Sequence, residues 1–98
     1  MDVLNAIAKV RFASARPQRV QLARAGRTVI DLLCMEPGQT LKVPAGRRAY
    51  YVVTGGARVE SKGAANDLAA GQLAVMGEGE AHTVSAVGEQ RLVCLVIG

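Results

Sequence analysis

Four polar side chains between positions 42 and 82 of the chain could carry chemistry. His82 is the only histidine, and because an imidazole titrates near neutral pH it is the candidate for acid–base catalysis or for contact with an anion. Lys42 and Arg48 are cations that suit a carboxylate or a phosphate, and arginine offers such groups a two-pronged fork. Tyr50 can donate a hydrogen bond at a cavity rim or at a subunit contact. These residues together predict a site for a small acidic ligand.

Each candidate also has a plainer structural alternative. His82 can be a semi-buried histidine that is held by a backbone partner, since no second catalytic group is evident beside it. Arg48 follows Arg47 in the irregular stretch "PAGRRA", where arginines usually reach solvent, and at most one of two neighbours in a strand can enter a cavity. For Tyr50 and Tyr51, packing is the default role.

The elements that must position these residues are short strands. From residue 28 the chain is a succession of short strand-like runs bounded by turns such as "EPGQ", "GEGE" and "GEQ", and eleven glycines supply tight corners. The runs are "TVIDLLCM", "TLKVP", "AYYVVT", "ARVESK", "QLAVM", "HTVSAV" and "RLVCLVIG", and "GAANDLAAG" is predicted to be a loop around a brief extended "DLA". Before it, "RVQLAR" alternates as a half-buried strand does, whereas Val3, Leu4, Ile7 and Val10 have helix-like spacing. The pattern predicts an all-β sandwich or barrel over 28–98, preceded by an extension over 1–27 with a short helix and a strand that packs on the barrel.

The turn residues of "GQLAVMGEGEAHTVSA" resemble the second conserved motif of the cupin family, G-x5-P-x-G-x2-H-x3-N. Gly71, Gly79 and His82 fall in register, while Gly77 stands at the proline position and Ala86 at the asparagine position. The resemblance implies a small cupin-type β-barrel, that is, a jelly roll or double-stranded β-helix.

The first cupin motif, G-x5-H-x-H-x3,4-E-x6-G, resembles residues 36–55 in its scaffold and not in its ligands. Gly55 matches the last glycine; counting back places Arg48 at the glutamate position, and Pro44 and Lys42 at the two histidine positions. Alternation along a strand then predicts that positions 42 and 44 face the interior together with His82, and the cupin pattern makes Tyr51 the structural aromatic. Metal-binding cupins use imidazoles and a carboxylate at the motif positions, and proline and arginine offer no electron pair. We therefore expect no metal site and no cofactor.

Composition narrows the remaining partners. Residues 1–27 carry six Lys or Arg and one acid, but the cations are spread singly without aromatics to stack on bases, so a solvated face is favoured over nucleic-acid binding. No apolar run is long enough to cross a membrane and no signal pattern opens the chain, so we expect a cytoplasmic protein. Cys34 and Cys94 lie in apolar runs, and in that compartment they are predicted to be buried free thiols.

The function expected from these features is binding or sensing of a small acidic ligand by a metal-free barrel. Two alternatives stay open: a metal-independent isomerase or epimerase that uses His82, and a structural barrel that serves dimerisation. A homodimer is expected because cupins commonly dimerise and edge strands need cover. The apolar C-terminal strand "RLVCLVIG" is predicted to be either central or exchanged with a partner.

Overall fold

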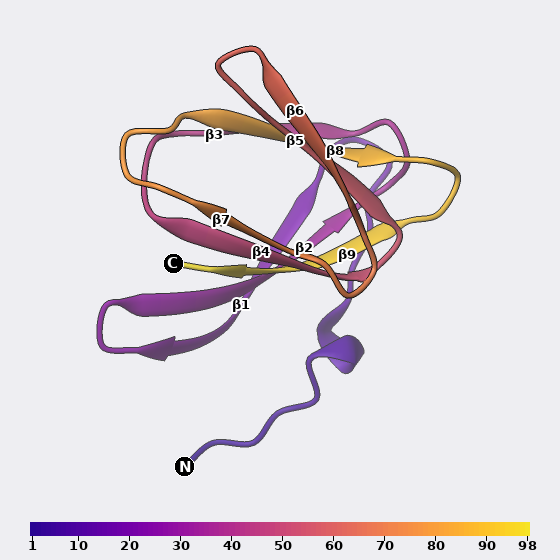
Figure 1. Cartoon of the computed structure of the whole chain (residues 1–98). Coiled ribbons are helices and arrows are strands. Elements are labelled where there is room, and N and C mark those ends of the chain that lie inside the picture. The colour runs from indigo at the N-terminus through magenta and orange to yellow at the C-terminus, as the bar shows by residue number, and fades with distance from the viewer.

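Nine strands in two facing antiparallel sheets form the protein, as a computed structural model of all of residues 1–98 shows (Figure 1). Eight of these strands agree with the predicted ones, and the ninth, Ala64–Ala69, lies in "GAANDLAAG", which the sequence predicts as a loop around a brief extended "DLA". The bounds of the nine strands are β1 Gln18–Ala25, β2 Thr28–Met35, β3 Thr40–Val43, β4 Arg48–Thr54, β5 Gly56–Ser61, β6 Ala64–Ala69, β7 Leu73–Met76, β8 His82–Val87 and β9 Leu92–Ile97. No helix of the structure is long and apolar enough to span a membrane.

The strands are divided between a five-stranded sheet, in the order β1-β2-β9-β4-β7, and a four-stranded sheet, in the order β3-β8-β5-β6. The C-terminal strand β9 therefore lies in the middle of its sheet, paired with β2 and β4. We call the face of each sheet that is turned toward the other its inner face. Fourteen buried residues of the inner faces form the main core, which is aliphatic apart from Tyr50 and the sulfur-containing side chains.

A second cluster lies on the outer face of the five-stranded sheet. Leu32, Cys34 and Val93 are buried there beneath Val10 and Phe12 of the N-terminal segment. Cys34 and Cys94 are both free and buried, as predicted, but on opposite faces of this sheet.

The expected N-terminal helix is wrong. Only a 3-10 turn forms, at Ile7–Lys9, and it ends where Val10 becomes extended. A helix this short is marginal in water, and Val10 and Phe12 instead bury their side chains on the outer cluster. Just before the turn, Oδ1 of Asn5 accepts a hydrogen bond from the amide of Ala8 at 3.3 Å.

Gly55 makes the crossover from one sheet to the other possible. It is the single residue between β4 and β5, with a φ of +82°. A Cβ at this position would lie 2.3 Å from the carbonyl oxygen of Arg91, so only glycine fits. The glycine shared with the first cupin motif thus has a backbone role that is independent of any ligand.

Candidate functional site

The polar centre of the interior is a hydrogen-bonded pair between the two sheets. The Tyr50 hydroxyl of β4 lies 2.6 Å from Nε2 of His82 at the start of β8, and both residues are buried. The other ring nitrogen, Nδ1, lies 2.9 Å from the carbonyl oxygen of Glu80. A carbonyl can only accept, so in the neutral imidazole Nδ1 carries the proton and Nε2 accepts a hydrogen bond from Tyr50. The backbone partner that the sequence suggested for His82 is therefore present, and a tyrosine satisfies the second nitrogen.

Burial keeps this tyrosine protonated. The loss of solvation raises the pKa of Tyr50 to about 12, although the positive charges of Arg48 and Arg19 act in the opposite direction. At neutral pH the hydroxyl therefore remains a hydrogen-bond donor to His82.

The expected roles of the two tyrosines are reversed. Tyr50 is 1% exposed in the core, whereas Tyr51 is 37% exposed on the outer face. The reason is register: Arg48, Tyr50 and Val52 alternate with Ala49 and Tyr51 along β4, and the inner set contains Tyr50.

The expected inward orientation of positions 42 and 44 is also wrong. Lys42 and Pro44 are exposed, and Val43 is the buried residue that pairs with His82. The motif allows three or four residues between its second histidine and its glutamate. The structure agrees with a spacing of four, which places Leu41 and Val43 at the histidine positions. A shift of one residue turns every side chain of a strand to the other face.

The residues at the four metal-ligand positions of the two motifs do not suit a metal. Leu41, Val43 and Arg48 offer no electron pair, and the lone pair of His82 Nε2 is directed at the Tyr50 hydroxyl. No three His, Cys, Asp or Glu side chains come together elsewhere in the chain either.

Arg48 is the candidate residue with unused binding capacity. It lies on the inner side of β4 next to Tyr50, and its Nε is buried without a hydrogen-bond partner. Its side chain lies in a groove of about 460 Å³ at the end of the five-stranded sheet, where Arg27, Arg47, Met76 and Gly98 also form the wall. No Asp or Glu lines this groove. Arg27 comes from the β1–β2 turn, and only the fold shows that it belongs to the site.

Lys42 is in a different place from Arg48. Together with His82 it lines an open groove of about 670 Å³ at the end of the four-stranded sheet, where Glu60 and Lys62 also form the wall. The structure thus joins Tyr50 to His82 by a hydrogen bond, and it places Lys42 in a groove that His82 also lines. Arg48 lies in a separate groove with two other arginines.

A second buried polar pair was not predicted. Asp31 is 8% exposed in the apolar run "DLLCM", and its Oδ2 accepts a hydrogen bond from Nε of Arg19 at 2.6 Å, while Oδ1 has no partner. An acid inside an otherwise apolar strand was the available signal. Its partner lies twelve positions earlier and becomes visible only through the pairing of β1 with β2.

Comparisons with known proteins agree with this architecture. No protein-family model matches the sequence, and it matches no curated protein. Among solved structures, TT1209 from Thermus thermophilus is 23% identical with a TM-score of 0.91, over 99% of this chain and 95% of that one. A Klebsiella pneumoniae protein with a double-stranded beta-helix domain is 21% identical with a TM-score of 0.87, over 99% of this chain and 88% of that one. An RmlC-like cupin protein from Desulfovibrio desulfuricans is 20% identical with a TM-score of 0.81, over 98% of this chain and 95% of that one. The protein therefore has the double-stranded β-helix fold of the cupin superfamily.

Proposed function

We propose that this barrel binds a small carboxylate or phosphate compound in the groove of Arg27, Arg47 and Arg48, without a resident metal. The observation that carries the proposal is the buried Nε of Arg48, which has no hydrogen-bond partner. A buried donor without a partner costs free energy, and an anion seated against the guanidinium would satisfy it with a charge-assisted hydrogen bond.

The surroundings of Arg48 support an anion as the ligand. Three arginines and no acidic side chain line the groove. Arg47 does pair with Glu78 at 3.4 Å, but both side chains are largely exposed, and an exposed ion pair of this kind contributes little. An entering anion can therefore compete for Arg47. A volume of about 460 Å³ is in the range of small-molecule sites.

The groove of Lys42 is the weaker candidate for an acidic ligand. Glu60 lines it, and its carboxylate would repel a second negative charge. In the pair of Tyr50 and His82, the imidazole reaches the wall of the Lys42 groove, but Tyr50 lines none of the four grooves. The pair consequently supports packing of the two sheets better than it supports an isomerase or epimerase.

Calorimetric titration with inorganic phosphate and with succinate tests the proposal. We expect saturable binding of at least one of these probes, and we expect Arg48→Gln to weaken it about tenfold or more, as the loss of a charge-assisted hydrogen bond implies. Lys42→Gln removes the same charge from the other groove and is the matched control, with an expected effect of less than about twofold. Absence of saturable binding, or equal losses in the two variants, would contradict the arginine groove as the site.

A further inference from the structure

A cleft opens between the two sheets along their free edges. β6 is the last strand of the four-stranded sheet, β7 is the last strand of the five-stranded sheet, and residues of both strands line a cleft of about 460 Å³ (Figure 1). We call it the edge cleft, and its walls include Val59, Asn66, Leu68, Ala74, Met76 and Glu80. None of the four polar residues that the sequence singled out lines it.

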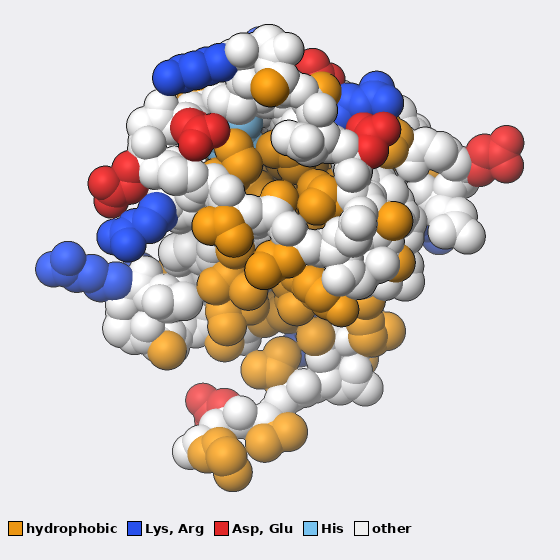
Figure 2. Space-filling model, in the orientation of Figure 1, with side chains coloured by type: hydrophobic (Ala, Val, Ile, Leu, Met, Phe, Trp, Pro, Cys, Tyr) orange, Lys and Arg blue, Asp and Glu red, His pale blue; other side chains and the backbone are white.

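The floor of the edge cleft is apolar. Val59 and Leu68 of the four-stranded sheet and Met76 of the five-stranded sheet belong to the main core, and Ala74 packs against that core. The interior of the barrel therefore reaches the surface between β6 and β7. Figure 2 shows hydrophobic side chains gathered in the middle of the same view, with charged ones mainly over the upper part of the molecule. A ligand that fills the cleft would remove apolar surface from water, which favours binding.

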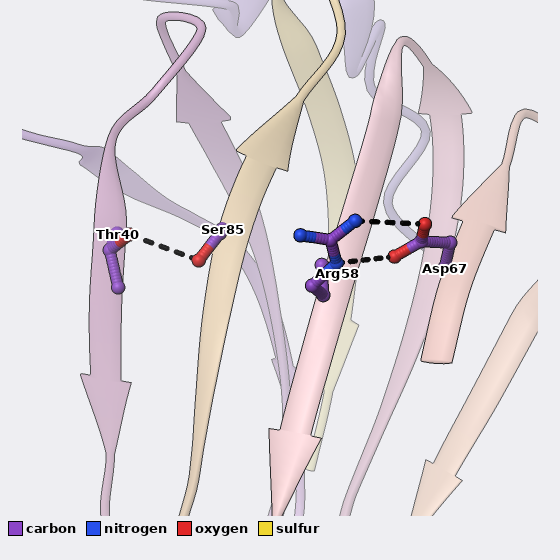
Figure 3. Close-up of polar contacts among 4 residues, drawn as sticks. All are labelled: Thr40, Arg58, Asp67 and Ser85. Carbon is purple, nitrogen blue, oxygen red and sulfur yellow. Dashed lines mark hydrogen bonds and ion pairs between the residues drawn. The ribbon is translucent and has the colours of Figure 1, made fainter. Parts of the chain in front are cut away.

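Two acids line the edge cleft, and only one of them has a cation as its partner. Asp67 points to the outer face of β6, where Arg58 forms a two-pronged ion pair with it at 2.7 and 3.1 Å (Figure 3). Glu80 takes part in none of the four ion pairs of the protein. No Lys or Arg lines the cleft. Its only uncompensated charge is therefore the negative charge of Glu80.

Hydrogen bonds and a glycine fix the position of Glu80. Its carbonyl oxygen accepts a hydrogen bond from Nδ1 of His82 at 2.9 Å, and the carbonyl oxygen of Ala81 accepts one from the hydroxyl of Ser61 at 3.2 Å. A Cβ at Gly77 would lie 3.2 Å from Oε1 of Glu80, so the carboxylate lies against the residue that follows β7. Gly77 has no positive φ, so its backbone does not require glycine. Glycine at this position, where the cupin motif has proline, instead leaves room for the carboxylate.

We propose that the edge cleft binds a small aliphatic ammonium compound, with its hydrocarbon body on the apolar floor and its positive charge at Glu80. A carboxylate without a cation partner offers an ammonium group a charge-assisted hydrogen bond. An aliphatic acid would fit the same floor but would be repelled by Glu80, and an alcohol would leave the negative charge uncompensated. The volume of the cleft is in the range of small-molecule sites. This second site prefers the opposite charge to the arginine groove and does not depend on binding there.

Titration of the isotope-labelled full chain with hexylamine at neutral pH, followed by amide NMR spectra, tests the proposal. At this pH the amine is an ammonium ion, as a lysine side chain is. We expect saturable shifts at the amides of Asn66, Leu68 and Ala74 in the edge cleft, and none at Arg27 in the arginine groove. Hexanol and hexanoate have hydrocarbon bodies of similar length, and we expect each to bind at least about fivefold more weakly.

Two matched pairs of variants locate the ligand. Glu80→Gln removes the charge and should weaken hexylamine binding about tenfold, whereas Glu89→Gln, which lies between β8 and β9 and lines none of the four grooves, should have no effect. Asn66→Phe fills the cleft from β6 and should abolish binding. Ala65→Phe places the same ring on the opposite face of β6 and is its control. Gly77→Ala displaces the carboxylate without removing its charge, and it should also weaken binding.

The outcomes separate this proposal from the anion site. Val75 and Met76 line both grooves, so no variant changes them. Glu80→Gln should leave the titrations with phosphate and succinate unchanged, and Arg48→Gln should leave hexylamine binding unchanged. Absence of saturable shifts in the edge cleft would overturn the proposal, whatever the result with phosphate. Equal binding of hexanol and hexylamine, or equal losses in Glu80→Gln and Glu89→Gln, would overturn it as well.

Discussion

The Tyr50 hydroxyl occupies the position next to Nε2 of His82 where a bound metal or ligand would have to lie. This hydroxyl is the hydrogen-bond donor to Nε2, and the pair links β4 in one sheet to β8 in the other across the core. A histidine that a metal-binding barrel would use for chemistry thus becomes a satisfied structural contact. The anion site that we propose uses instead the arginines at the end of the five-stranded sheet.

Tyr50→Phe is expected to lower the free energy of unfolding by about 1–3 kcal/mol, because it leaves the Nε2 acceptor of His82 buried without a donor. Tyr51→Phe is the matched control: its side chain is 37% exposed, and the expected change is within about 0.5 kcal/mol. Urea denaturation of both variants measures the difference. Equal losses would mean that the hydrogen bond contributes nothing.

Alkaline pH is expected to destabilise the protein through Tyr50 and Cys94. Burial raises the pKa of each to about 12, from ordinary values of 10.0 and 9.0. Because the unfolded chain loses these protons first, the stabilisation is complete below pH 9 and is lost as the pH rises from 9 toward 12. The expected loss is on the order of a few kcal/mol.

Urea midpoints across that pH window measure the effect. In Tyr50→Phe the loss of stability between pH 10 and 12 should become smaller, because only the contribution of Cys94 remains there. Stability that is independent of pH in this window would contradict the inferred burial of both groups.

At the scale of the elements, glycine and register determine the site. Gly55 lets the chain pass from β4 into β5, and the register of β3 against β8 turns Val43 inward and Lys42 outward. The same alternation puts Arg48 and Tyr50 on one side of β4. Local backbone geometry thus decides which polar side chains face the interior.

Gly55→Ala is expected to cost more than about 3 kcal/mol, because the strain of a positive φ adds to the 2.3 Å approach of its Cβ to the Arg91 carbonyl oxygen. Gly88 has nearly the same φ, +83°, with no atom near the position of a Cβ, so Gly88→Ala should cost only about 1–2 kcal/mol. Chemical denaturation of both variants separates the two contributions. Similar losses would show that the close approach is relieved by a small shift.

At the scale of the whole molecule, the N-terminal segment covers part of the outer face of the five-stranded sheet. Phe12 packs on the cluster that contains Cys34, and the guanidinium of Arg91 lies 4.7 Å from the centre of its ring. Cys94 lies on the inner face, which this segment does not cover. The two cysteines therefore report separately on the outer and inner faces of the five-stranded sheet.

Phe12→Ala is expected to speed the labelling of Cys34 by a thiol reagent severalfold and to leave Cys94 unchanged, since only Cys34 lies beneath the N-terminal segment. Mass spectrometry of peptides after timed labelling measures each site. In the wild-type protein both thiols should react slowly, because burial raises the pKa of each. Equal acceleration at the two sites would indicate global unfolding instead.

Much of the fold could be predicted because it depends on local rules. Short runs between turn residues located every strand except β6, glycines located the corners, and spacing in the second motif singled out His82. The inward residues of β3 could not be predicted, because a gap of three or four residues is allowed by the motif and one residue reverses every side chain. The roles of Tyr50 and Tyr51 were reversed although alternation from Arg48 along β4 places Tyr50 inward. Asp31 was missed for a related reason: its partner Arg19 is brought to it only by strand pairing.

The sequence by itself determined the class of fold and the loss of the metal ligands, since both follow from residue types at short spacing. Only the tertiary structure decided what replaced the ligands. The contact of Tyr50 with His82, the approach of Arg27 to Arg48, and the pairing of β2 with β9 and β4 all join segments that are distant along the chain. Such contacts depend on which strands pair and in which register, and these are set by the packing of the whole core.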